Sequence, residues 1–204
     1  MAESPGERGI VATVALATML APLSSTMIAV ALPSVILEFD ADVATAGWLV
    51  TAYLIGMASV QPAAGNLGDR LGRRPLILGG VACFGLASLA AAWASSLPAL
   101  LVFRVLQAVA CAIALPNGAG LLREVIPAER RAGRFGLVGA AIAFAAAAGP
   151  SLGGFLVGQA GWRAIFLVNI VLVVPAVLIG WRSIPARPAK DTSHGFDLGA
   201  PSCS

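Results

Sequence analysis

The sequence has few charged residues, and this scarcity excludes most classes of water-soluble protein. Asp, Glu, Lys and Arg together make up 11% of the 204 residues, whereas soluble domains contain roughly a quarter. The chain is 58% hydrophobic and its mean hydropathy is +0.89. A soluble protein of this length would not need so much apolar surface, so the composition indicates a membrane protein.

Histidine and paired cysteines are also scarce, which argues against metal sites, disulfide frameworks and catalytic clusters. The one histidine, His194, lies in a polar C-terminal stretch, and Cys83, Cys111 and Cys203 form no Cys-x-x-Cys pair. The basic residues lie in short clusters between apolar runs, which argues against a nucleic-acid partner. The sequence therefore predicts no metal, no cofactor and no enzymatic activity.

What the sequence does contain is six apolar runs, each about as long as the 20 residues that a helix needs to cross a bilayer. The runs lack the two-residue alternation of membrane barrels, and backbone groups in lipid must bond internally, so helices are expected. The first run is too long for a signal peptide and lacks a convincing cleavage site. The expected spans are 10–31, 47–67, 75–94, 98–122, 135–159 and 163–181, between an N-terminal segment 1–9 and a linker-like tail 182–204.

The distribution of Lys and Arg predicts the orientation of these spans. If the N-terminus is cytoplasmic, the cytoplasmic segments contain Arg8, Arg70, Arg73, Arg74, Arg123, Arg130, Arg131, Arg134, Arg182, Arg187 and Lys190. The opposite segments contain Arg163 and the acids Glu38, Asp40 and Asp42. This asymmetry follows the positive-inside rule, so a multi-pass protein of the cell membrane with both termini in the cytoplasm is expected.

One charged residue, Arg104, lies in the middle of the fourth run, where its insertion costs roughly 2.5–3.5 kcal/mol. In one interpretation, backbone carbonyls or a neighbouring helix satisfy the guanidinium and it holds the bundle together. In the other, which we favour, Arg104 lies in a water-filled cavity and faces a substrate.

The fifth run contains small residues at four-residue spacing, a pattern that lets helices approach closely in lipid. These residues form two series, Ala145, Gly149 and Gly153, and beside them Pro150, Gly154 and Gly158. Pro150 removes one backbone donor, so a bend is also expected there. Ordinary helix packing is the alternative, but the Gly-Pro followed by Gly-Gly is more specific than that.

The charged stretch GNLGDRLGRRP, at 65–75, resembles the loop between spans 2 and 3 of the major facilitator superfamily. The matching residues are Gly65, Leu67, Asp69, Arg70, Gly72, Arg73 and Arg74. GPSLGG in the fifth run resembles the antiporter signature of that superfamily. The stretches 31–56 and 161–169 are similar to its drug:proton antiporter branch with 14 spans.

The resemblance implies an all-α bundle of two inverted three-helix repeats, which forms the N-terminal half of a secondary carrier. It implies a cytoplasmic gate that stabilises the outward-facing state, a substrate cavity and a pliable fifth-span interface. The implied gate residues are Gly65, Asp69, Arg70, Gly72 and Arg73; those of the cavity are Arg104 and Gln107; those of the interface are Gly149, Pro150, Gly153 and Gly154. From the spacing alone, Asp69 and Arg73 should share one helical face, and Pro75 should lie in the first turn of span 3.

The sequence departs from the family pattern in span 1, where Ser24 occupies the position at which the drug-antiporter branch has an acid. Ala108 likewise replaces the usual glycine in span 4. A proton-coupled carrier needs a titratable group in its cavity, and the apolar parts of the spans contain no Asp, Glu or His. The resemblance therefore supports a carrier more strongly than a proton antiporter.

The leading hypothesis is an efflux carrier for small amphipathic or drug-like molecules that works by alternating access. Such a half needs membrane lipid, a small-molecule substrate and a second six-span half, supplied by another chain or by a second copy. The competing hypothesis is a truncated, non-transporting membrane protein or an assembly subunit.

Overall fold

The computed structural model describes residues 5–185, and every regular element in that range is an α-helix. The helices are α1 (Pro5–Phe39), α2 (Val43–Leu71), α3 (Arg73–Ala92), α4 (Leu97–Val125), α5 (Ala128–Ala160) and α6 (Ala164–Ser183). All six are long and apolar enough to cross a membrane. The prediction of an all-α membrane protein with six spans is confirmed.

The helices extend past most of the apolar runs because charged residues can continue a helix beyond the lipid. Thus α1 reaches Phe39 rather than residue 31, and α5 starts at Ala128 rather than at 135. Capping side chains set some of the true ends: Asp42 accepts from Thr45 N at 2.8 Å, before α2. The predicted tail beyond residue 185, with Arg187, Lys190, His194 and Cys203, lies outside the described residues, as do residues 1–4.

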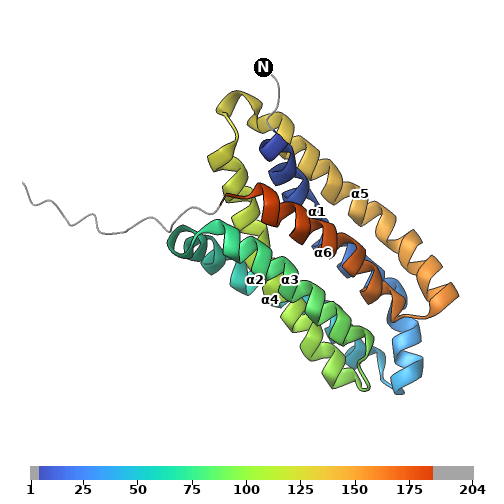
Figure 1. The fold of residues 1–204 in the computed structure, drawn as a ribbon. Coiled ribbons are helices and arrows are strands. Elements are labelled where there is room, and N and C mark those ends of the chain that lie inside the picture. Colours follow the sequence, from blue (N-terminus) through green and yellow to red (C-terminus); the bar gives the residue numbers. More distant parts are fainter. Residues whose placement is uncertain (1–4, 186–204) are drawn as a thin grey trace, which may run out of the picture.

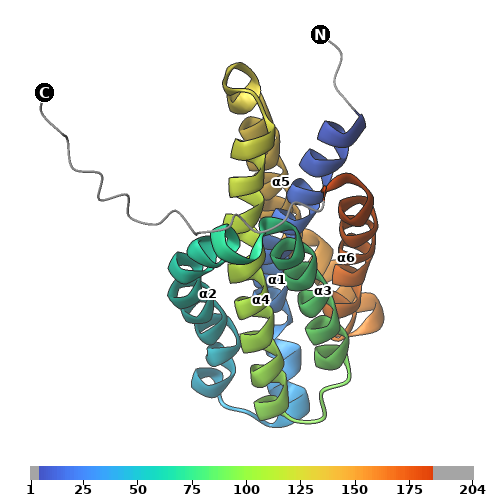
Figure 2. The same ribbon diagram turned by 60° about the vertical axis from the view of Figure 1, so that its left-hand side comes forward.

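The six helices form two triplets of opposite orientation, α1–α3 and α4–α6 (Figures 1 and 2). The most extensive contacts are those of α1 with α5, α2 with α4, α3 with α4 and α1 with α6. If the two triplets are exchanged, α1 takes the place of α4, α2 that of α5 and α3 that of α6. The α1–α5 contact then corresponds to the α4–α2 contact, and the α3–α4 contact corresponds to the α6–α1 contact. Because each triplet has three helices, α1 and α4 run in opposite directions, so the contacts have the symmetry of an inverted repeat.

The bundle has two ends, which we call the N-terminal face and the opposite face. The N-terminal face holds the start of α1, the α2–α3 turn, the α4–α5 turn and the end of α6, whereas the other three connections lie at the opposite face (Figure 2). Each end has an apolar core. Ile77 and Leu122 belong to the cluster at the N-terminal face, and Leu100 and Trp162 to the cluster at the opposite face.

Two of the helices, α2 and α5, have little of their surface covered. In each, 17% of the most apolar 18-residue window is buried, against 33–56% in the other four helices. Their exposed side chains include large apolar ones, such as Trp48 on α2 and Phe144 and Phe155 on α5. The described bundle therefore leaves two apolar helices open on its surface.

Candidate functional site

The charged α2–α3 turn is built around Gly72. Its φ of 86° lies in the left-handed region that favours glycine, and it ends α2 at Leu71 and starts α3 at Arg73. The expectation that Asp69 and Arg73 share one helical face is therefore wrong, because the helix breaks between them. They still form an ion pair, with Arg73 Nη2 2.7 Å from Asp69 Oδ1 across the turn. Pro75 lies in the first turn of α3, as expected.

Arg73 connects this turn to the end of α4. Its Nε donates to Glu124 Oε1 at 2.7 Å, and its guanidinium lies over Gly120, where a Cβ would stand 1.7 Å from Nη1. Neither Glu124 nor Gly120 was among the residues predicted from the sequence. The available signal was Glu124 itself, an acid beside the arginines that follow the fourth run.

Arg74 connects the same turn to the end of α6. Its Nη2 donates to the carbonyl oxygen of Trp181 at 2.8 Å, and its guanidinium lies 5.4 Å from the centre of the Trp181 ring. Of the other predicted gate residues, Arg70 is exposed and Gly65 is partly exposed. The close approach of α2 to α4 occurs instead at Gly68, where a Cβ would lie 1.6 Å from Asn117 Oδ1.

Arg104 is completely buried, and its hydrogen bonds reach two other helices. Its Nε donates to the carbonyl oxygen of Leu49 at 3.2 Å, and its Nη1 donates to Ser24 Oγ at 2.8 Å and to Gln107 Oε1 at 2.9 Å. The guanidinium also lies 4.2 Å from the centre of the Tyr53 ring. The two predicted cavity residues, Arg104 and Gln107, therefore lie in direct contact.

The polar network continues from Gln107 into α3 and α6. Gln107 Nε2 donates to Ser88 Oγ at 2.6 Å, and Asn169 Nδ2 donates to the same oxygen at 3.4 Å. Ser88 and Asn169 are fully buried. Ser88, Tyr53 and Asn169 were not among the residues predicted from the sequence, although Asn169 ends the family-like stretch 161–169. Five helices thus contribute to one buried network, which we call the Arg104 network.

The Arg104 network contains no carboxylate from the described part of the chain. The acids within residues 5–185 are Glu7, Glu38, Asp40, Asp42, Asp69, Glu124 and Glu129, and all lie at or beyond helix ends. Arg104 Nη2 has no hydrogen-bond partner among the described residues. Ser24, the residue at which the sequence departs from the expected acid, contacts this guanidinium directly. The departure seen in the sequence therefore leaves the buried cation without an acid beside it.

The small residues of α5 divide between two faces of that helix. Gly149 and Gly153 are buried against α1, and a Cβ on Gly149 would lie 1.8 Å from Thr26 Oγ1. Pro150 and Gly154 are exposed, and the helix continues through Pro150. The predicted interface motif thus has one half in the α1–α5 contact and the other half on the open face of α5.

Metal binding has no structural basis in residues 5–185, since no three His, Cys, Asp or Glu side chains there could hold an ion together.

Comparison with known proteins identifies relatives over almost the whole chain. A sequence profile described as Major Facilitator Superfamily matches residues 14–201. The MFS-type transporter YvkA of Bacillus subtilis is 40% identical over 94% of this chain. The tetracenomycin C resistance and export protein of Streptomyces glaucescens is 35% identical over 91%, and the multidrug efflux pump LfrA of Mycolicibacterium smegmatis is 36% identical over 91%.

The chain spans less than half the length of these relatives: 43% of YvkA, 34% of the tetracenomycin protein and 37% of LfrA. Among solved structures, the proton:xylose symporter XylE superposes with a TM-score of 0.76 at 17% identity. That match covers 86% of this chain and 44% of XylE, and it shows a shared fold.

Proposed function

This chain belongs to the major facilitator superfamily, whose members are membrane transporters and not enzymes, and from that premise we propose that it is the N-terminal half of a secondary active efflux carrier. The proposed substrates are small amphipathic or drug-like molecules. Relatives that are described as a multidrug efflux pump and as an antibiotic resistance and export protein support this substrate class. The family itself acts on small molecules in the membrane.

The observation on which the proposal depends most is the burial of Arg104 at the centre of a polar network from five helices. A buried guanidinium is expensive in a membrane, and a purely structural contact could use a cheaper polar side chain. We propose that Arg104 and Gln107 contact substrate when alternating access separates the helices that now enclose them. In the described conformation Arg104 and Gln107 are fully buried, so a substrate cannot reach them.

We further propose that a second six-helix half covers the open faces of α2 and α5. The support is their low burial and their exposed apolar side chains, such as Trp48 and Phe144, together with the greater length of the relatives. A separate chain or a second copy could provide that half. Purified protein should then associate in detergent and show substrate-dependent flux in liposomes; absence of both would favour the truncated or assembly-subunit alternative.

The drug:proton antiporter branch with 14 spans remains our proposal for the subfamily, supported by the stretches 31–56 and 161–169. The proposed location is the cell membrane with the N-terminal face toward the cytoplasm, supported by the arginines gathered on that face, such as Arg73 and Arg130. Since the apolar parts of the described spans contain no Asp, Glu or His, a coupling carboxylate would have to come from the second half.

We propose that the α2–α3 turn is the cytoplasmic gate, with Asp69 and Arg73 as its working pair. Asp69→Asn is expected to reduce export of a fluorescent dye by about tenfold while thermal stability changes by less than about 0.5 kcal/mol, because Asp69 is 63% exposed and exposed ion pairs are weak. Dye efflux and thermal unfolding of the same membrane preparation would measure both. Equal export by the two forms would exclude Asp69 from the gate.

Ser24 offers a test of coupling. Ser24→Asp would place a carboxylate beside Arg104, whose Nη1 lies 2.8 Å from Ser24 Oγ. We expect the variant to make dye export by the assembled carrier depend on a pH gradient, because it restores a titratable group to the centre of the bundle. Ser25→Asp, on the adjacent position, is the control. Unchanged pH dependence in Ser24→Asp would show that this position does not set coupling.

A further inference from the structure

The α5–α6 connection, at the opposite face, forms a charged contact that the proposed function does not use. Arg163 Nη1 lies 2.6 Å from Glu38 Oε1, and Trp162 Nε1 donates to Glu38 Oε2 at 2.6 Å. Arg163 Nη2 also donates to the carbonyl oxygen of Ala94 at 3.3 Å. These contacts connect the end of α1, the end of α3 and the start of α6.

The arrangement repeats that of the α2–α3 turn step by step. Each turn starts with a glycine of positive φ, 86° at Gly72 and 78° at Gly161. The next residue donates to a glutamate near the end of the first helix of the other triplet: Arg73 to Glu124 on α4, and Trp162 to Glu38 on α1.

The second residue after each glycine is an arginine, and it also has an equivalent role. It donates to a carbonyl near the end of the third helix of the other triplet: Arg74 to Trp181 on α6, and Arg163 to Ala94 just after α3. Exchanging the triplets therefore converts one set of contacts into the other, at opposite ends of the bundle. The two sets differ in the first donor, which is arginine in one turn and tryptophan in the other. They also differ in their further ion pairs, because Arg163 pairs with Glu38 as well, whereas Arg73 pairs with Asp69.

We propose that Glu38, Trp162 and Arg163 form a second latch at the opposite face, the inverted-repeat counterpart of the Arg73–Arg74–Glu124 latch. Its release lets the opposite ends of α1, α3 and α6 separate while the N-terminal face stays closed. Its use during transport rests on the proposed carrier function, whereas the local opening does not.

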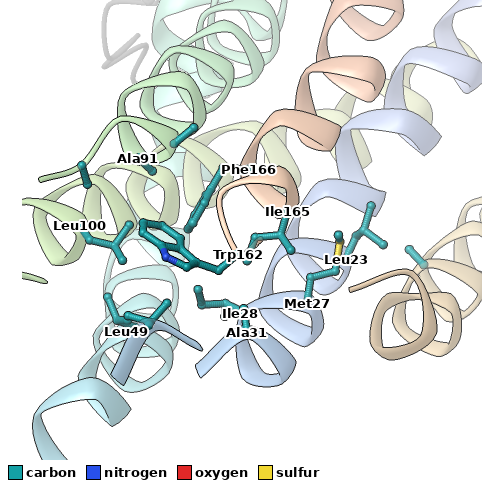
Figure 3. Packing of buried hydrophobic residues seen from close by; sticks show 14 residues of the cluster. Leu23, Met27, Ile28, Ala31, Leu49, Ala91, Leu100, Trp162, Ile165 and Phe166 are labelled. Atoms are coloured by element: carbon teal, nitrogen blue, oxygen red, sulfur yellow. The ribbon is translucent and has the colours of Figure 1, made fainter. Parts of the chain in front are cut away.

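The exposure and packing of these side chains fit a contact that opens and closes. The side chains of Glu38 and Arg163 are each 40% exposed, so water can replace their bonds at little cost. The Trp162 ring is buried, between Leu100 and Phe166 in the apolar cluster (Figure 3). The buried Trp162 ring thus favours one position of the α5–α6 turn. The hydrogen bonds and the ion pair of Glu38 then set how often the turn opens.

Cysteine accessibility can test this separation of the two ends. In a chain with Cys83, Cys111 and Cys203 replaced by alanine, Leu100→Cys reports on the opposite face and Leu122→Cys on the N-terminal face. Both leucines are fully buried. We expect Glu38→Gln to raise the N-ethylmaleimide alkylation rate of the Leu100 reporter by about fivefold, the effect of losing one exposed ion pair, and to change that of the Leu122 reporter less than about twofold.

Arg73→Gln should give the reverse pattern, with faster alkylation at the Leu122 reporter alone. Trp162→Phe removes the Nε1 donor together with part of the buried ring system, so it should accelerate alkylation at the Leu100 reporter at least as much as Glu38→Gln, and it replaces that variant if Glu38→Gln folds poorly. Asp40→Asn, which makes the same charge change two residues beyond Glu38, just after α1, is the matched control and should leave both rates unchanged. Equal acceleration at both reporters, or none at either, would overturn the latch, and neither result depends on whether the chain transports a substrate.

Discussion

Methionine in place of Arg104 is expected to reduce export by about 100-fold while leaving the bundle about as stable as before. The arginine costs roughly 2.5–3.5 kcal/mol to place at the centre of a membrane helix. Its three described hydrogen bonds, at about 0.6 kcal/mol each in a membrane, and its contact with the Tyr53 ring, at about 1 kcal/mol, return a similar amount. The two contributions nearly cancel, so stability should change by less than about 1 kcal/mol.

The export rate should fall strongly, because the proposed substrate contact needs both the positive charge of Arg104 and the several N–H donors of its planar guanidinium. We expect dye export by Arg104→Met to fall by about 100-fold, equivalent to about 2.7 kcal/mol of the barrier. Arg104→Lys keeps the charge without the fork and should retain part of the activity. Flux in liposomes and thermal unfolding would be measured on the same samples. Normal export by Arg104→Met would remove Arg104 from the substrate path.

Leucine in place of Gly149 is expected to destabilise the bundle by about 3 kcal/mol, the upper part of the range for overpacking. Even a methyl group there would lie 1.8 Å from Thr26 Oγ1, which is held by bonds to the carbonyl oxygens of Pro22 and Leu23. Relief requires Thr26 to give up those bonds or α5 to move away from α1. Since α1 and α5 share one of the largest contacts in the molecule, either change should be costly.

Gly154 provides the matched control on the same helix. A methyl group there would have Val30 Cγ1 as its nearest neighbour, at 3.8 Å, and the residue is exposed. The free energy of unfolding of Gly154→Leu should therefore lie within about 1 kcal/mol of that of the unsubstituted protein. Thermal unfolding in detergent would compare the two variants. Similar losses at both positions would mean that the four-residue series does not define the α1–α5 contact.

The arrangement of six spans was predictable because it depends on hydrophobicity summed over about 20 residues, a property of continuous sequence. The break at Gly72 was not, since the spacing of Asp69 and Arg73 fits an unbroken helix as well as a turn. Only the positive φ of Gly72 distinguishes the two. Asp69 and Arg73 nevertheless form an ion pair, because an unbroken helix and the turn at Gly72 both bring these two residues into contact.

The partners of the predicted site residues were harder to find than the residues themselves. Arg104 was visible as a charge in an apolar run, but Ser24 and Leu49 lie 80 and 55 positions away from it in the chain. Glu124 lies 51 positions from Arg73, and Glu38 lies 124 from Trp162. Such pairs depend on how the two triplets pack together, so they cannot be predicted from the residues near each partner in the sequence.

The unequal helix lengths divide the molecule into two electrostatic regimes. At about 1.5 Å per residue, the 20 residues of α3 and of α6 match a hydrocarbon layer of about 30 Å, whereas the 35 residues of α1 extend about 20 Å beyond it. The ion pairs at both ends consequently stand among headgroups and water, where dissolved salt screens charges over about 8 Å at physiological ionic strength. Arg104, on α4, is completely buried within the protein and out of reach of those ions. Changes in salt should therefore act on the two ends of the bundle and leave its centre untouched.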